Sequence, residues 1–252
     1  MRRGLAAALI LAALPARAEV LVLMMSTQDV AIASNFTGSR VTLFGVIERD
    51  FASVSRPSKY DVVVTVSGPA APVLVREKER KWPLWVNRTV WRYSDVPGYY
   101  ALLTTGPVLG VANEAARERQ KMGLTFQLPA LAELPDEINP DKIAREALFR
   151  IRKQQALLIE DARGIAMPRP YLFSAAIALP ARAPTGRYVV TATVLSEGVP
   201  LKSTSTSFTV RKTGFEAYVA AYARDNGWLY GLATALLAVS LGFLGNLIFR
   251  RD

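Results

Sequence analysis

The side chains best suited to chemistry lie between residues 76 and 93, where the sequence REKERKWPLWVNRTVWRY interleaves basic residues with three of the four tryptophans. A guanidinium group offers paired donors to an oxyanion, and an indole ring offers a rigid contact surface. We interpret the stretch as an anion site or a protein-docking edge. The alternative is an ordinary strand pair, with tryptophans in the core and charges in solvent. The candidate binding residues are Arg76, Lys78, Trp82, Trp85, Asn87 and Arg88.

Side chains for catalysis are scarce. The chain contains no histidine and no cysteine, which excludes a Ser-His-Asp or Cys-His nucleophile and imidazole or thiolate zinc sites. The acidic pairs Asp136-Glu137 and Glu160-Asp161 are poor catalytic dyads, because neighbours in sequence usually point apart. Neither a phosphate-binding glycine-rich loop nor an acidic calcium loop occurs. We therefore expect no enzymatic activity, no cofactor and no metal.

The elements that must position the basic and aromatic stretch are β-strands. Residues 19–25 form a continuous apolar run, typical of a buried strand, and residues 40–49 alternate, with Val41, Leu43 and Ile47 on one face. Short strands separated by turn-forming residues indicate an immunoglobulin-like antiparallel sandwich. Further strands are expected at 29–34, 60–69, 72–80, 84–93, 99–105, 171–179, 186–197 and 207–212.

The pattern changes to helical spacing at about 111–163, which predicts a helical insertion in the sandwich. One helix is expected at 111–123, and a second begins at Asn139-Pro140, an N-cap followed by proline. The second helix either lies on a membrane or partner, or packs on its own domain, and we favour packing. Its apolar positions are Ile143, Ala147, Leu148, Ile151 and Leu158.

Residues 228–249 are uncharged and number about the ~20 residues needed to cross a bilayer. Trp228 and Tyr230 stand at one end and Arg250-Arg251 at the other, which predicts a cytoplasmic C-terminus with a tail at 250–252. A juxtamembrane helix is expected at 216–227. Small residues and one amide follow one seam of the span. The hypothesis is that this seam packs against a permease helix or a second copy of the chain. The alternative is that the stripe arises by chance, because small residues are common in membrane helices. The seam consists of Gly231, Ala235, Ala238, Gly242, Gly245 and Asn246.

Residues 1–18 resemble a signal peptide, with Arg2-Arg3, an apolar run at 5–14 and Ala16-Arg17-Ala18 as cleavage site. An uncleaved anchor is the alternative, although the run is short for a bilayer. Residues 19–215 are then a periplasmic domain of a single-pass inner-membrane protein. The whole chain has a formal net charge of +10, and without the signal-peptide arginines and the charged tail the exported part keeps an excess of about six basic residues. This mild excess suits the lipid bilayer, a small anion or an acidic partner, whereas nucleic acid is not expected in this compartment.

Several stretches, in order, resemble a family of alphaproteobacterial transmembrane proteins with no established activity. They are FTGSRVTLFG, YDVVVTVSGP, VREKER followed by LWVN, VPGYY, and TGFEAYV before the span. The resemblance covers nearly the whole mature chain. Members are often encoded beside permeases of the sulfite-exporter type, which implies an accessory role in transport, and no site residue is established for the family.

Two functions remain open from the sequence. The first is a non-catalytic, membrane-anchored periplasmic accessory protein that docks onto an inner-membrane transporter. The alternative is a periplasmic ligand-binding module that holds a small oxyanion or an envelope polymer through residues 76–93.

Overall fold

The computed structural model describes residues 19–33, 36–48, 59–127 and 140–249. The signal peptide expected at 1–18, the pair Asp136-Glu137 and the tail at 250–252 lie outside the described residues. Two sheets, a separate two-stranded hairpin and five α-helices make up the described part of the chain. The prediction of a mainly β protein with antiparallel sheets and a C-terminal span-length helix is confirmed. Its immunoglobulin-like topology stays a prediction.

The first sheet has four antiparallel strands in the order β1-β3-β10-β9. Alternation in β3 buries Val41, Leu43 and Ile47, as the sequence predicts. In β1, by contrast, Leu21 is buried while Val20 and Met24 are exposed, so the prediction of a fully buried run was wrong. The strands are β1 (Val20–Met25), β3 (Gly38–Glu48), β9 (Ile165–Arg169) and β10 (Leu172–Pro180).

The second sheet has six strands in the order β2-β12-β11-β4-β7-β8. Its inner pairs are antiparallel, but the edge strands β2 and β8 run parallel to their neighbours β12 and β7. The fully antiparallel sandwich expected from the sequence is thus corrected at both edges. The strands are β2 (Asp29–Ile32), β4 (Asp61–Ser67), β7 (Tyr100–Thr104), β8 (Leu158–Asp161), β11 (Gly186–Ser196) and β12 (Val199–Lys212).

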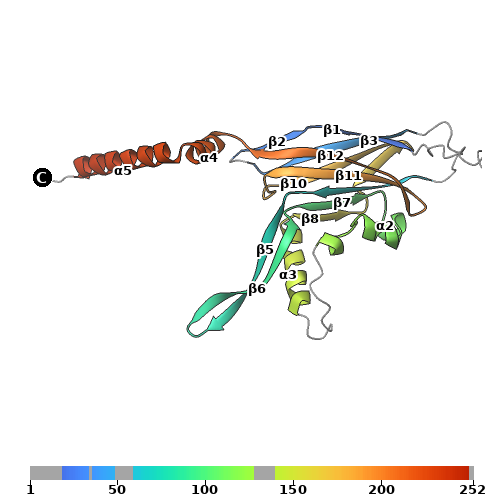
Figure 1. Ribbon diagram of the computed structural model, residues 1–252, viewed down its shortest axis with the longest axis horizontal. Coiled ribbons are helices and arrows are strands. Elements are labelled where there is room, and N and C mark those ends of the chain that lie inside the picture. The colour runs from blue at the N-terminus through green and yellow to red at the C-terminus, as the bar shows by residue number, and fades with distance from the viewer. Residues whose placement is uncertain (1–18, 34–35, 49–58, 128–139, 250–252) are drawn as a thin grey trace, which may run out of the picture.

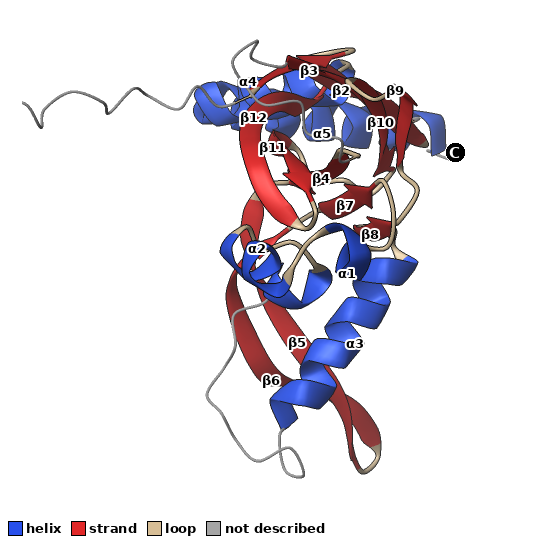
Figure 2. Cartoon of the chain, turned by 90° about the vertical axis from the view of Figure 1, so that its right-hand side faces the viewer, coloured by secondary structure: helices blue, strands red, loops and turns tan. Residues whose placement is uncertain are grey.

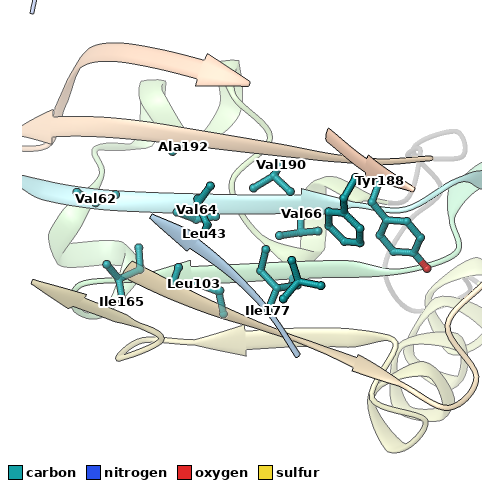
Figure 3. Packing of buried hydrophobic residues seen from close by; sticks show 14 of the residues in the cluster. Leu43, Val62, Val64, Val66, Leu103, Ile165, Ile177, Tyr188, Val190 and Ala192 are labelled. Carbon is teal, nitrogen blue, oxygen red and sulfur yellow. The ribbon is translucent and has the colours of Figure 1, made fainter. Parts of the chain in front are cut away.

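The core lies between the two sheets. Leu43 and Ile177 from the first sheet face Val64 and Val190 from the second (Figure 3). At one end, the Tyr188 hydroxyl donates to the Pro184 carbonyl at 2.7 Å, which satisfies the polar atom of a buried ring. Burial of such apolar side chains is the main favourable term in folding. The sandwich can therefore fold without disulfides.

Helices cover the outer face of the second sheet (Figure 2). The Asn113 side chain caps α2 by accepting from the Ala116 backbone N–H at 2.8 Å. Val111, Ala116 and Met122 are buried in a cluster that includes Leu102 of β7. The helical segments are α1 (Val108–Val111), α2 (Glu114–Arg119), the 3₁₀ turn η1 (Leu124–Gln127) and α3 (Pro140–Gln154).

The predicted helical insertion is corrected in two ways. Leu158 starts strand β8 rather than continuing a helix, because α3 ends at Gln154. Leu148 of α3 is buried, but Ile143 and Ile151 on the same predicted apolar stripe are exposed. A helix that leans on a hairpin on one side buries only the part of its stripe that meets that neighbour.

The last two helices extend away from the sandwich along the long axis of the molecule (Figure 1). Helix α4 (Phe215–Asp225) follows β12 after two residues, and α5 (Gly227–Phe249) follows α4 after Asn226. Hairpin strands β5 (Ala70–Lys81) and β6 (Leu84–Pro97) leave the sandwich in a different direction.

Candidate docking hairpin

Among the described strands, β5 and β6 pair only with each other, and they project from the sandwich as a two-stranded ribbon (Figures 1 and 2). Their register runs from Ala70 opposite Pro97 to Lys81 opposite Leu84, which leaves Trp82-Pro83 as a two-residue turn. The peptide bond in this turn is cis. The basic and aromatic stretch of the sequence is therefore the outer half of one hairpin.

The base of the hairpin is held against helix α3. Tyr93 and Val96 of β6 are buried together with Leu148 of α3. The Arg152 side chain donates to the Pro97 carbonyl oxygen, and burial lowers the pKa of this guanidinium. A cavity of about 10 Å³ remains between these elements, which is room for roughly one water molecule. The packed base sets the direction in which the hairpin points.

The register divides the outer hairpin into two unlike faces. Lys78 pairs with Asn87 and Arg80 with Trp85, so these four residues share a face because side chains directly opposite in a ladder point the same way. Arg76, two residues before Lys78, belongs to the same face. We call Arg76, Lys78, Arg80, Trp85 and Asn87 the basic face. The acidic residues of β5 occupy the alternate positions 77 and 79, so the basic face concentrates positive charge.

The structure places five of the six predicted binding residues on this face or at the turn. Trp82 lies in the turn, where its ring centroid is 5.5 Å from the Arg80 guanidinium carbon, within cation–π reach. Arg88 occupies the alternate position in β6, opposite Glu77 in the register. By register, the six predicted positions therefore do not all fall on one face, because position 88 alternates with those of the basic face.

The exposure of the tryptophans corrects the alternative drawn from the sequence. Trp82 is 81% exposed, Trp85 is 67% exposed, and their neighbour Leu84 is 68% exposed. These two rings do not fill a core. We call residues 80–85 the hairpin tip. An exposed ribbon with large apolar rings and cations has the composition of an interface rather than of an ordinary solvated strand pair.

The shape of the hairpin bears on its chemistry. The five side chains of the basic face are all exposed to solvent. A projecting ribbon presents these groups outward, whereas sites for small ligands are usually concave and surround most of the ligand. The arrangement is better suited to contact with a broad surface than to enclosure of a small molecule.

The predicted packing seam lies in α5, on one side of the helix. A Cβ atom added at Gly231, Gly242 or Gly245 would have, apart from the helix's own nearby backbone, no atom of the described chain within 4 Å. The hydroxyls of Thr234 and Ser240 donate to carbonyl oxygens of their own helix. The seam is open to a neighbouring helix, and its role in assembly stays a prediction.

One exposed apolar surface was missed from the sequence. Val22 and Met24 of β1 lie opposite Val46 and Phe44 of β3, on the face of the first sheet turned away from the core. All four side chains are exposed. The continuous apolar run of β1 does not reveal which face of the strand is covered. The signal for this surface lay in β3, where the apolar Phe44 and Val46 alternate with the core positions Val41, Leu43 and Ile47.

A β-sandwich followed by one apolar helix defines the class of this molecule. Residues Gly227–Asn246 of α5 are long and apolar enough to cross a membrane and are not buried by the rest of the chain, which fits a single-pass membrane protein. The family model described as "Putative transmembrane protein (Alph_Pro_TM)" matches residues 20–251, and the chain belongs to this family. The description names no activity. A comparison with curated proteins found no match.

Proposed function

We propose that this protein is a non-catalytic, membrane-anchored accessory protein that docks onto a transporter of the inner membrane. In this proposal the sandwich lies in the periplasm and α5 holds it to the bilayer. The observation that carries the proposal is the basic face of the projecting hairpin. Arginine and tryptophan are the residue types most often found at the centres of protein interfaces.

The charge of the hairpin defines the partner that it fits. Arg76, Lys78 and Arg80 occupy successive positions on one face of the hairpin. The two glutamates of this segment occupy positions 77 and 79, which alternate with that face. Complementary potentials steer association and exclude wrong partners. The expected partner surface is therefore acidic and lies just outside the membrane.

The anchor makes a weak interface sufficient. Helix α4 has 11 residues, so it separates the sandwich from the span by about 17 Å at 1.5 Å per residue. A partner in the same bilayer meets the hairpin at a high effective concentration. Docking therefore needs only a modest contact area.

Co-purification in mild detergent at native expression tests the docking. The charge reversal Arg76→Glu with Lys78→Glu should reduce recovery of the transporter at least about tenfold, because like charges would now face each other. The matched control is Arg187→Glu with Lys202→Glu, which reverses two exposed cations on β11 and β12 and should leave recovery unchanged. Recovery of the wild-type chain alone under several detergents would contradict the proposal.

The same cluster of three cations favours a second candidate, a module that binds a small oxyanion or an anionic envelope polymer. A ligand that binds only the folded state raises the melting temperature by mass action. Sulfite, sulfate, thiosulfate and phosphate should then stabilise the full chain in detergent, and the Arg76→Glu/Lys78→Glu variant should lose the effect. An unchanged melting temperature at millimolar anion removes small anions from consideration and leaves docking.

A further inference from the structure

We propose that the hairpin tip, residues 80–85, inserts into the headgroup layer of the same bilayer that α5 spans. The tip would be a second, shallow membrane contact of this chain. The inference shares with the proposed function the anchoring by α5 and two residues of the basic face, Arg80 and Trp85. It does not require a transporter, so the two ideas fail separately.

The direction of the hairpin supports this contact. In Figure 1 the hairpin leaves the sandwich obliquely, and its tip reaches back along the long axis as far as α4, toward the end that carries α5. The turn between β11 and β12 lies at the other end, because β12 starts there and runs 14 residues before leading into α4. The tip is thus turned toward the side on which the membrane must lie.

The lengths of the elements agree with this geometry. Strand β5 has 12 residues and extends about 40 Å at about 3.3 Å per residue. Helix α4, with 11 residues, spans only about 17 Å. An oblique ribbon more than twice as long as the spacer helix can cover the distance from the sandwich to the membrane surface.

The composition of the tip matches the headgroup layer. Tryptophan is enriched at membrane surfaces, where one part of the ring is apolar and the N–H stays hydrated. Trp82 and Trp85 flank Pro83 and Leu84, and Arg80 and Lys81 supply cations for anionic headgroups. No acidic residue lies within 80–85.

The start of α5 offers a comparison within the same chain. Trp228 and Tyr230 are exposed on the first turns of α5, at the end of the span that joins the sandwich. These rings are typical of the interfacial belt of a span. The tip repeats this chemistry, so two tryptophan-bearing elements would meet one membrane surface.

The backbone of the turn limits insertion to the headgroup layer. Lys81 and Leu84 close the ladder, and the polar groups of the turn itself need hydration or other partners. Unpaired backbone groups are not tolerated in the hydrocarbon. Pro83 carries no N–H and so removes one such donor.

A single cysteine tests the contact directly, because the chain contains none of its own. Leu84→Cys, labelled with an environment-sensitive fluorophore, is reconstituted as the full chain in vesicles of phosphatidylethanolamine and phosphatidylglycerol. The matched control is Val199→Cys, an exposed apolar residue beside the turn between β11 and β12. We expect a blue shift and quenching by lipids spin-labelled near the headgroup at position 84, and quenching only by aqueous iodide at position 199.

Two further results sharpen the outcome. Adding Trp82→Ser and Trp85→Ser should return the label at position 84 to aqueous quenching, while circular dichroism and the melting temperature stay unchanged because both rings are exposed. Equal iodide quenching at positions 84 and 199 in wild-type vesicles would overturn the proposal. Shielding of position 84 that arises only when other membrane proteins are added would overturn it too, and would assign the tip to protein docking.

Discussion

Two long hairpins in this protein have similar lengths and opposite surroundings. Strands β11 and β12 contribute 11 and 14 residues, and β5 and β6 contribute 12 and 14. Each turns through two residues. The first hairpin lies inside a six-stranded sheet with one face against the core, while the second stands alone beyond its base. Similar backbone pairing thus builds part of the folded core in the β11–β12 hairpin and leaves an exposed surface in the outer half of the β5–β6 hairpin.

The difference lies in what covers each ribbon. Tyr188, Val190 and Val194 of β11 are fully buried by the opposite sheet. An isolated two-stranded ribbon is at best marginally stable in water, and the outer half of β5–β6 has no second layer among the described residues. Its large exposed rings, Trp82 and Trp85, therefore contribute little to the folded core, as both the proposed docking and the proposed membrane contact require.

The largest expected effect compares one ring from each hairpin. Phe208 of β12 stacks on Tyr188 at 5.0 Å between ring centroids and is 1% exposed. Phe208→Ala should lower the free energy of unfolding by about 3–5 kcal/mol. Trp85→Ala should change it by less than about 0.5 kcal/mol, as expected for an exposed side chain. Urea unfolding of the full chain in detergent, followed by circular dichroism, measures both. Equal losses would mean that the outer hairpin belongs to the folded core.

A smaller effect is expected where the projecting hairpin meets α3. Leu148→Ala should cost about 2–3 kcal/mol and should loosen the base formed with Tyr93 and Val96. Hydrogen exchange of residues 70–97 should accelerate more than that of β11. Ile151→Ala, an exposed position on the same helix, is the control and should leave exchange unchanged. Uniform acceleration of both hairpins would show that they unfold as one unit.

Alkaline pH should weaken the sandwich through its buried tyrosines. Burial raises the pKa of Tyr100 to about 12, and its hydroxyl donates to the Lys121 carbonyl at 3.2 Å. The folded state holds this proton more tightly than the unfolded state does, whose tyrosine pKa is about 10. The contribution of Tyr100 to the free energy of unfolding should therefore be constant below about pH 10 and should be lost as the pH rises from about 10 through about 12.

Melting temperatures recorded between pH 9 and 12 check this expectation. Tyr100→Phe should be less stable at neutral pH by about 1 kcal/mol, because the Gly123 N–H that donates to the hydroxyl loses its acceptor. The same variant should show a shallower alkaline decline. An identical decline in wild type and variant would assign the pH dependence to groups other than Tyr100, among them the buried Tyr99 and Tyr188, whose pKa values are also raised by burial.

The smallest effect on folding is expected from the span, because Gly227–Asn246 is not buried by the rest of the chain. Ala238→Leu with Gly242→Leu fills the seam of α5 but should leave insertion and the unfolding of the sandwich unchanged, because leucine inserts readily. Association should be lost, because close backbone approach drives packing in lipid. Energy transfer between labelled chains in vesicles, or capture of a permease, measures the assembly. Ala233→Leu with Ser240→Leu, off the seam, is the control, and assembly retained by the seam variant would make the span an anchor only.

Much of the candidate site follows from local chemistry. The density of tryptophan and arginine at 76–93 marks the segment as a candidate contact surface, and Pro83 separates the two strands expected there. Which residues share a face followed only from the register. A bulge between Val75 and Arg76 shifts that register. The alternation within one strand does not predict such a shift, because the register depends on how two strands pair.

The sequence by itself determined the local elements: alternating β3 with Val41 and Leu43 inward, the helix after Pro140, and the uncharged stretch that becomes α5. Periodicity records these features because each depends on neighbours within a few residues. Tertiary structure alone decided that β5 and β6 join neither of the two larger sheets, that Leu158 starts an edge strand, and that Val22 and Met24 remain exposed. Alternation shows that two faces differ, but only contacts between distant segments decide which face another layer covers.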